Sequence, residues 1–461
     1  MYDKKGLQRL LHAAFYGRRL LQIESGCTPE QIKAGIASGM IREIPGITRK
    51  GNRLFCNGCG NDHPMLFGWH SCFCCKEQKC MYCRNCITLR KISACTSLYV
   101  WNQEDFIPPQ LPQKGELLMW QGRLTPAQSN ASQKVIRQIE KNEDILIHAV
   151  TGSGKTEMLF YPMAYALSQK KKVCFSSPRT DVILEILPRL ISVFPQLPIG
   201  VFYGGSKVRD FAAPLILSTT HQLMRFHQMF DVCILDESDA FPYRIDSTLK
   251  FSLQNALKMQ HTLIYCTATP EPTLLKTLKK INVPIVFVAK RFHGRPLEVP
   301  HFFWVGNWKR KLDQGVLPYP LIVRLKKSLE QNRQVFLFVA YVEIAKQVQR
   351  ILAHKKFRVL YVYAEDSRRK EKVEAFRKKE VDIIVTTTIL ERGVTVPFSD
   401  VMVLGSEVDL FDASALIQIS GRAGRHEKDT EASVYFFHKG ITSAMRQAKK
   451  QIIRMNRLAK E

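Results

Sequence analysis

Short apolar runs alternate with helical periods along most of the chain after residue 115. One of these runs covers residues 145–149, and another covers residues 230–236. Buried strands that alternate with helices are typical of parallel sheets with helices on both faces. The pattern therefore predicts an α/β protein built from two such units.

The same pattern divides the chain into five segments. We expect short helices in residues 1–50, a cysteine-rich module at 51–100, α/β units at 115–288 and 320–461, and a connection at 289–319. The basic end of the chain, KKQIIRMNRLAKE, predicts an amphipathic helix.

The connection between the two units is rich in proline, tryptophan and basic residues. Its Trp304 and Trp308 could stack on nucleic-acid bases, as aromatic side chains do in single-strand binders. They could also pack at the junction of the two units, and packing is the favoured interpretation.

Composition indicates a globular protein. The 461 residues, 45% of them hydrophobic, allow two to four domains of about 150 residues each. No apolar run approaches the ~18 residues that a membrane helix requires. The first residues lack the continuous apolar stretch and cleavage site of a secretion signal. We therefore expect a soluble, cytoplasmic protein.

The charge points to a polyanionic partner. The formal net charge is +27, and the isoelectric point is about 9.6. An excess of this size favours electrostatic binding to nucleic acid. A solvated lysine-rich surface or attraction to an anionic membrane face are the alternatives, and the second would place the protein peripherally at the membrane.

Most of the 13 cysteines fall between residues 56 and 86. Two C-x-x-C pairs stand there, Cys56/Cys59 and Cys83/Cys86, and each such pair can offer two thiolates to one tetrahedral zinc ion. Disulfides are not expected in an intracellular protein. We predict a structural zinc site with these four ligands, which would fold a small platform.

The other cysteines of this segment leave alternatives open. Cys72, Cys74, Cys75 and Cys80, or His63 and His70, could replace a predicted ligand or form a second site. Basic residues near the second pair could let the platform touch phosphates, although an ordinary solvated rim is equally compatible. These basic residues are Arg84, Arg90 and Lys91.

The stretch AVTGSGKTEM predicts a phosphate-binding loop, because an apolar strand precedes it and a helix follows it. Backbone N–H groups from Gly152 through Ser153 and Gly154 to Thr156 would surround the phosphates of ATP. Lys155 would reach the β- and γ-phosphate oxygens, and the Thr156 hydroxyl would bind Mg²⁺.

A second motif, FDVCILDESDAF, is a strand that ends in adjacent carboxylates. Asp236 would bind Mg²⁺, and Glu237 would orient and deprotonate the attacking water. An acidic pair at the start of a helix is the alternative, which the upstream phosphate-binding loop makes less favoured.

The order of motifs after residue 115 resembles that of superfamily 2 helicases. The series consists of SPR (177–179), STTHQL (218–223), TAT (267–269), FLFVA (336–340), TTTILERGVTVP (386–397) and QISGRAGR (418–425). The resemblance implies two RecA-like parallel-sheet motor lobes after a small four-cysteine zinc-binding module.

The resemblance also implies roles for individual residues. Gln128 would read adenine, Gly393 would line the nucleotide from the second lobe, and Arg422 and Arg425 would reach the γ-phosphate as catalytic arginines. Residues expected at the nucleic-acid backbone are Arg179, Thr219, Thr220, Thr386, Thr387 and Thr388. For the threonine triplet, a place in a core strand is an equal alternative.

Within that superfamily the chain most resembles the ComFA family of late competence ATPases. The likeness rests on CNGCG and YCRNC before the ATP-binding lobe, on KRFHGRPLEVP, and on LFDASALIQ before QISGRAGR. It implies a DNA-stimulated ATPase that moves on single-stranded DNA during uptake in natural transformation, with the competence protein ComFC and the membrane channel ComEC as partners. A PriA-like DNA helicase, an RNA helicase and a DNA-binding module with an inactive motor remain alternatives.

Overall fold

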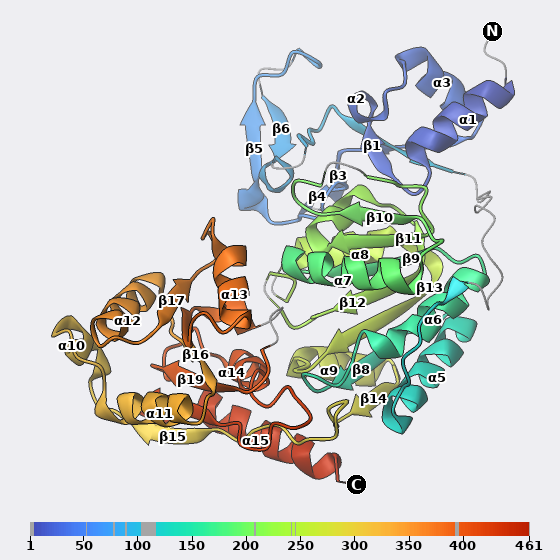
Figure 1. The fold of residues 1–461 in the computed structure, drawn as a ribbon. Helices are drawn as coiled ribbons and strands as arrows, with labels where there is room; N and C mark the ends of the chain where they lie inside the picture. Colours follow the sequence, from blue (N-terminus) through green and yellow to red (C-terminus); the bar gives the residue numbers. More distant parts are fainter. Residues whose placement is uncertain are drawn as a thin grey trace.

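The protein consists of an N-terminal module and two α/β lobes (Figure 1). The computed structural model describes residues 4–460 except 52, 77–78, 88–89, 103–116, 207–208, 241, 245 and 392–395. No helix in this described part of the chain has both the length and the apolar character that a membrane crossing needs.

The first lobe is built on a seven-stranded sheet in which all pairings are parallel. Its strands, in spatial order, are β10 (Ile199–Phe202), β11 (Leu215–Thr219), β9 (Val173–Ser177), β12 (Phe230–Asp236), β13 (Leu257–Thr267), β8 (Ile145–Ala149) and β14 (Ile285–Val288). β8 and β12 are the strands that the apolar runs predicted. Strands β8, β9 and β11 are buried along their whole length, as in sheets covered on both faces.

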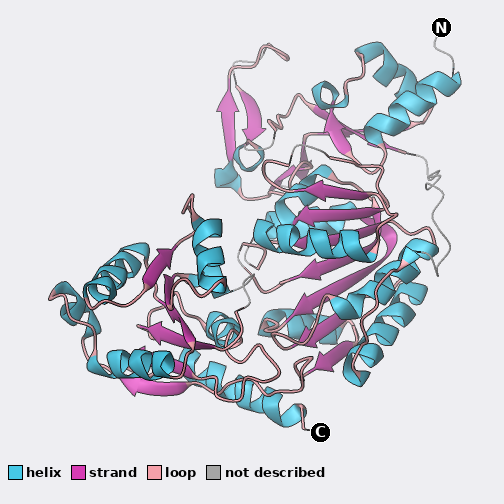
Figure 2. Ribbon diagram, viewed as in Figure 1, coloured by secondary structure: helices cyan, strands magenta, loops and turns pink. Residues whose placement is uncertain are grey.

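Helices flank this sheet on both sides (Figure 2). They are α5 (Pro126–Lys141), α6 (Glu157–Ser168), α7 (Thr180–Val193), the 3₁₀ helix η3 (Thr220–Arg225), α8 (Ser247–Ala256) and α9 (Pro272–Lys280).

The second lobe has a six-stranded sheet, again with parallel pairings throughout. Its order is β15 (His301–Trp304), β20 (Val434–His438), β19 (Ser399–Leu404), β16 (Gln334–Phe338), β18 (Ile383–Thr386) and β17 (Val359–Val362). Its helices are α10 (Trp308–Asp313), α11 (Tyr319–Glu330), α12 (Val342–His354), α13 (Arg369–Arg377), η4 (Thr388–Glu391), α14 (Ala413–Ser420) and α15 (Ser443–Leu458). α15 contains most of the predicted C-terminal helix.

Residues 289–319, predicted as the connection between the lobes, contain β15 and α10. Both elements belong to the second lobe, so part of the predicted connection does too. Trp308 packs, but in the core of the second lobe and not at the predicted junction: it is 1% exposed, and its indole Nε1 donates a hydrogen bond to Glu407 at 2.8 Å. Trp304, in contrast, is 71% exposed. Packing therefore accounts for only one of the two tryptophans.

The N-terminal module combines the expected short helices with small antiparallel sheets. The helices are α1 (Lys4–Phe15), α2 (Gln22–Ser25), α3 (Pro29–Ala37), η1 (Pro64–Leu66) and η2 (Arg84–Cys86). The strands are β1 (Arg19–Leu21), β7 (Ser97–Trp101) and β2 (Ile41–Pro45) in one sheet, with hairpins of β3 (Ile47–Lys50) and β4 (Arg53–Cys56) and of β5 (Phe67–His70) and β6 (Cys80–Cys83). Because β7 lies between β1 and β2, residues 1–50 and the cysteine-rich segment fold together.

Candidate active site at the seam between the lobes

The predicted phosphate-binding loop joins the carboxyl end of β8 to α6. Gly152 and Gly154 have positive φ angles of 81° and 73°. A Cβ atom on Gly154 would lie 2.3 Å from the Gln128 side-chain nitrogen, so only glycine fits there. Ser153 is fully buried, and its N–H donates to the Val150 carbonyl at 3.2 Å. The loop thus has the tight, glycine-dependent turn that a phosphate cradle needs.

Gln128 fixes this loop from the side. Its side-chain nitrogen donates to the Ser153 carbonyl at 2.8 Å, while its side-chain oxygen accepts a hydrogen bond from the Thr125 N–H at 2.8 Å. Both ends of the amide are therefore engaged within the protein. In this arrangement Gln128 connects the start of α5 to the loop, and the adenine contact stays a prediction.

The adjacent carboxylates lie at the carboxyl end of β12, in the middle of the sheet. Asp236 is the last residue of the strand, and Glu237 follows with a left-handed φ of 58°. The Glu237 N–H donates to the Cys266 carbonyl on β13 at 2.9 Å. Left-handed backbone is uncommon for glutamate and costs about 1 kcal/mol, and such positions gather at functional sites.

Arg179 lies beside this acidic pair. It follows β9, the neighbour of β12, and its Nε is 3.9 Å from the Glu237 carboxylate. Its side chain is 22% exposed, and that of Glu237 is 13% exposed. The structure therefore places Arg179, which the motif series predicts at the nucleic-acid backbone, within reach of the predicted water-activating group.

Asp239, the last residue of DESD, connects three motifs. Its carboxylate accepts hydrogen bonds from the Thr267 hydroxyl and, at 2.6 Å, from the Thr269 hydroxyl. It also accepts one from the Ser414 hydroxyl of α14 at 3.1 Å, and the Thr269 and Ser414 hydroxyls are 2.7 Å apart. The TAT motif is thus linked through one carboxylate to the helix that carries QISGRAGR in the other lobe.

The phosphate-binding loop itself touches the second lobe. The Thr151 hydroxyl donates to the Gln418 side-chain oxygen at 3.2 Å, and both residues are buried. A Cβ atom on Gly421 would lie 2.7 Å from Thr151, so the glycine permits this close approach. Ion pairs flank the seam: Arg244 with Asp412 at 2.8 Å and Arg369 with Asp181 at 2.7 Å.

Arg291, from the connection, occupies the same seam and was not predicted. It is 2% exposed, and its Nη1 donates to the carbonyls of Ala423 and Gly424, at 2.9 and 2.5 Å. Its Nε lies 3.9 Å from where a Cβ of Gly152 would be. Within the described residues its Nε and Nη2 have no hydrogen-bond partner. Burial, with the nearby Arg425 charge as a smaller cause, lowers its pKa to about 10, so it remains charged at neutral pH.

The two arginines predicted for catalysis follow α14. Arg422 is 3% exposed. The Nε of Arg425 donates to the Gly421 carbonyl at 2.9 Å, and burial lowers its pKa to about 10. Since the Gly421 backbone lies against Thr151, the segment that carries both arginines begins next to the phosphate-binding loop. Gly393, predicted at the same nucleotide, falls outside the described residues.

The predicted backbone-gripping threonines differ in accessibility. Thr219 is 5% exposed, whereas Thr220 and Thr386 are fully buried. Thr386 ends β18 and thus takes the core position that was the alternative for the triplet. Thr387 and Thr388 are half-buried. Of the triplet, these two have partly exposed side chains.

The four predicted zinc ligands come together in the N-terminal module. Their sulfur atoms all lie within 4.8 Å of one another, with Cys56 to Cys86 and Cys59 to Cys83 at 3.6 Å each. The edge of a tetrahedron with Zn–S distances of about 2.3 Å is about 3.8 Å. The arrangement is consistent with zinc. A second group with the same closeness consists of Cys72, Cys75, Cys80 and Cys95, and Cys95 was not predicted.

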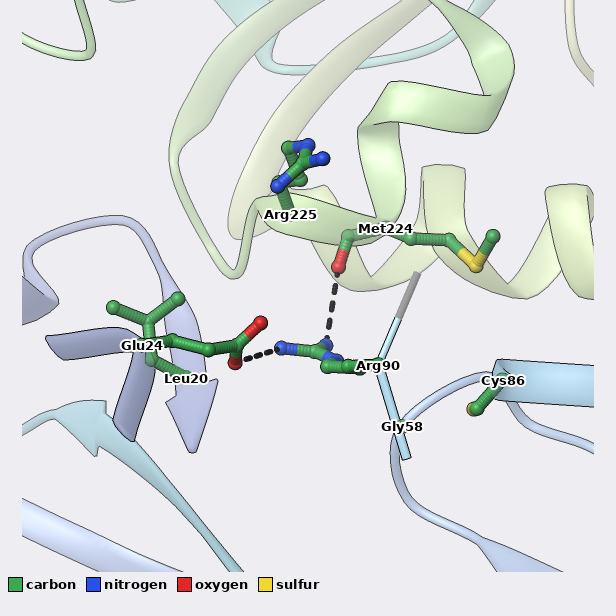
Figure 3. A pocket seen from close by; sticks show the side chains of 7 residues that line it. All are labelled: Leu20, Glu24, Gly58, Cys86, Arg90, Met224 and Arg225. Atoms are coloured by element: carbon green, nitrogen blue, oxygen red, sulfur yellow. Dashed lines mark hydrogen bonds and ion pairs between the residues drawn. The ribbon is translucent and has the colours of Figure 1, made fainter. Parts of the chain in front are cut away.

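Arg90 anchors the cysteine-rich module on the first lobe. Its Nη1 pairs with Glu24 at 3.1 Å, and its Nη2 donates to the Met224 carbonyl at 3.4 Å across a small pocket (Figure 3). Arg19 donates to the Gly58 carbonyl and to the Asn255 side chain, both at 3.1 Å. Arg90, considered from sequence as a phosphate contact, is therefore occupied in docking the module.

The N-terminal module and each of the two lobes match a family model. Residues 4–100 match the competence protein ComFA N-terminal domain, residues 125–277 the DEAD/DEAH box helicase domain, and residues 320–427 the helicase conserved C-terminal domain. Helicase domains of this type imply ATPase activity.

Two curated relatives are similar over most of the chain. The competence protein ComFA of Bacillus subtilis (strain 168) is 41% identical over 457 residues, 99% of this chain and 96% of that protein. ComFA of Streptococcus pneumoniae is 35% identical over 427 residues, 91% of this chain and 94% of that protein.

Solved structures with much lower identity share the fold. Saccharomyces cerevisiae Dbp5 bound to RNA and ADP BeF3 gives a TM-score of 0.52 at 15% identity, covering 75% of this chain and 93% of that one. RecG bound to a three-way DNA junction gives 0.51 at 18% identity, covering 74% and 46%. The two lobes are thus of the RecA-like type, and by its sequence this chain belongs to the ComFA family of competence proteins.

Proposed function

We propose that this chain hydrolyses ATP at the seam between its lobes and uses the cycle to move along single-stranded DNA during uptake in natural transformation. The observation that carries the proposal is the contact between Thr151 of the phosphate-binding loop and Gln418 of α14. A nucleotide held by that loop would lie where two separate lobes meet. Its binding and loss would therefore change the contact between the lobes.

The residues around the loop have complementary roles in this proposal. Lys155 and the N–H groups of Gly152, Gly154 and Thr156 hold the phosphates, since the Ser153 N–H already donates to the Val150 carbonyl. Thr156 and Asp236 would hold Mg²⁺, which would screen the negative charge of the phosphates. Glu237 accepts the proton of the attacking water. Arg422 and Arg425, supplied by the other lobe, stabilise charge that develops on the transferred phosphate.

Arg179 and Arg291 extend this set. We assign Arg179 to positioning the Glu237 carboxylate, because the two side chains lie 3.9 Å apart. Arg291 is a buried cation with two N–H-bearing nitrogens that have no partner among the described residues. Such groups are costly unless an acceptor is supplied. A phosphate bound by the neighbouring loop would be that acceptor. Nucleotide binding would then change the contacts of Arg291 and, through it, of the segment that connects the lobes.

Movement requires that hydrolysis alters the grip on DNA. The Asp239 carboxylate joins TAT to Ser414, and this provides a path from the acidic motif to the second lobe. The grips themselves are proposed at the strand ends that carry Thr219 in the first lobe and Thr387 and Thr388 in the second. Contacts through the phosphodiester backbone would be independent of sequence and weakened by salt.

The cysteine-rich module would serve the first lobe as a rigid platform. Cys56, Cys59, Cys83 and Cys86 are proposed to bind one zinc ion, whose four thiolates leave no open position for catalysis. Peripheral attachment at the membrane and the partners ComFC and ComEC remain predictions from the family resemblance.

ATP hydrolysis with different nucleic acids tests the proposed function. Turnover is compared without nucleic acid and with single-stranded DNA, duplex DNA or RNA of equal length. Single-stranded DNA should give the greatest acceleration. Lys155→Ala and Glu237→Gln should each lower turnover on the order of 100-fold or more, because each removes transition-state stabilisation. The exposed residues Lys141 and Glu143 supply matched controls, Lys141→Ala and Glu143→Gln.

Two results would contradict the proposal. One is equal turnover with and without single-stranded DNA. The other is full turnover in both Lys155→Ala and Glu237→Gln, which would place hydrolysis elsewhere. Greater acceleration by RNA than by DNA would identify RNA as the nucleic acid on which the chain acts, and it would leave the proposed ATP site unchanged.

A further inference from the structure

A second group of four cysteines lies at the outer part of the N-terminal module. The sulfur atoms of Cys72, Cys75, Cys80 and Cys95 all lie within 4.8 Å of one another. The Cys95 sulfur is 3.6 Å from that of Cys72 and 3.6 Å from that of Cys80. These are the same separations as in the first group, and they match the edge of about 3.8 Å expected for four thiolates around zinc.

The fold brings these residues together from three separate places in the chain. Cys80 begins β6, and Cys83 of the first group ends it, so one strand supplies both groups. Ser93 bridges to Tyr82 of this strand, and the Ala94 N–H donates to the Met81 carbonyl at 2.8 Å. This pairing sets Cys95 beside the start of β6. Cys72 and Cys75 approach from the loop after β5.

Neither packing nor disulfide bonding accounts for this group. Cys95 is exposed, and Cys72 and Cys75 are only half-buried, so the group is not an apolar core. A disulfide joins two sulfur atoms at about 2.05 Å. Here Cys95 is equally distant from two partners. One shared centre for four sulfur atoms explains this symmetry, whereas a choice of pairs does not.

We propose that Cys72, Cys75, Cys80 and Cys95 bind a second zinc ion, independent of the first. Cys74 is exposed and stands outside the group, and the His70 ring nitrogens contact Ser71, Ser93 and Lys91 instead. The closed thiolate site has a structural role: it holds the segment that carries Cys72 and Cys75 on β6. The fully exposed Phe73 and the exposed Lys76 and Lys79 lie next to these ligands in the sequence, so the metal fixes the position of aromatic and basic side chains.

The zinc content of the full-length protein, purified with a non-metal-binding reductant, tests this proposal. Zinc is measured by elemental mass spectrometry against protein concentration. The wild type should contain two zinc ions per chain. Cys72→Ser and Cys95→Ser should each contain one, Cys59→Ser should contain one through loss at the first site, and Cys74→Ser should keep two.

Binding of cobalt gives a second measure of the number of metal sites, which does not depend on how much zinc is lost during purification. The metal-free protein should bind two equivalents of Co²⁺ with absorption typical of tetrahedral thiolate sites, and Cys95→Ser should saturate at one. Because Cys72 and Cys95 lie toward the surface, unchanged circular dichroism of these variants checks that they fold.

Specific results would overturn the proposal. One zinc per wild-type chain, unchanged by Cys72→Ser or Cys95→Ser, would show that the second group binds none. A disulfide from Cys95 to Cys72 or Cys80, found by peptide mapping of the purified wild type without reductant, would also exclude the site. A loss of one zinc in Cys74→Ser with none in Cys95→Ser would refute this ligand set.

Discussion

The Ser414 hydroxyl in the second lobe donates a hydrogen bond to the Asp239 carboxylate in the first lobe, at 3.1 Å. The same carboxylate accepts hydrogen bonds from both threonines of TAT. The carboxylate of Asp239, in the DESD motif, thus contacts both TAT and α14. If the two lobes are coupled during hydrolysis, this contact is one place where the coupling acts.

Ser414→Ala should weaken that coupling. A hydrogen bond to a charged group contributes about 1.5–3 kcal/mol, so the stimulation of ATP hydrolysis by single-stranded DNA should fall on the order of tenfold. Hydrolysis without DNA should change little, because the substitution leaves Asp236 and Glu237, the carboxylates proposed to act in hydrolysis, unchanged. Ser443→Ala, at an exposed position at the start of α15, is the control. Equal stimulation in Ser414→Ala and the wild type would exclude this contact from coupling.

Arg291→Ala should raise the KM for ATP, because it removes a buried guanidinium next to Gly152. Arg291→Lys should restore only part of the loss, since lysine keeps the charge but lacks the planar fork of donors. Arg295→Ala changes a neighbouring, more exposed arginine of the same segment and should leave the KM unchanged. If Arg291→Ala alters thermal stability but not the KM, Arg291 is a structural link only.

One variant, Arg179→Ala, distinguishes two roles of this arginine. If it positions Glu237, Arg179→Ala should lower ATP hydrolysis on the order of tenfold even without DNA, as expected when a catalytic group loses its orienting partner. If it instead grips the DNA backbone, the variant would hydrolyse ATP normally without DNA and bind single-stranded DNA more weakly. DNA-free turnover and DNA affinity, measured on the same preparation, separate these outcomes.

The buried side chain of His148 should make the folded protein less stable in acid. Burial lowers its pKa from 6.5 to about 4, and its Nε2 lies 3.2 Å from the Ala268 carbonyl oxygen. The unfolded chain therefore binds a proton between pH 6.5 and 4 that the folded chain does not. Folding is destabilised as the pH falls through this window, by at most about 1.4 kcal/mol per pH unit.

His148→Gln should remove this contribution. Its Tm should fall less than that of the wild type between pH 7.5 and pH 5.5. Some loss should persist, because burial also lowers the pKa of His227 to about 4. His354→Gln, at an exposed position near the end of α12, should behave as the wild type. An identical fall of Tm in His148→Gln and the wild type would contradict the prediction.

The sequence was informative wherever a short contiguous pattern determines structure. The apolar run before the glycine-rich loop identified β8, and the run before the carboxylates identified β12, because a buried parallel strand requires apolar residues at both faces. The C-x-x-C spacing identified Cys56, Cys59, Cys83 and Cys86 as one group, because each pair offers two thiolates and a tetrahedral zinc site needs four.

Contacts between distant segments were not accessible in this way. Asp239 and Ser414 are 175 positions apart, and Arg291 and Ala423 are 132 apart, so no local pattern relates them. Cys95 lacks a neighbouring cysteine, and only strand pairing around β6 places it with Cys80. The strands β1 and β3 have three and four residues, too few for a period of two to emerge.

The most direct test of the central claim is displacement of streptavidin from biotinylated single-stranded DNA. A motor that moves along the strand should release streptavidin from one end and not from the other, only with hydrolysable ATP, and not in Lys155→Ala. If single-stranded DNA stimulates hydrolysis but streptavidin stays bound at both ends, the chain consumes ATP without directional movement, and the proposed function is contradicted.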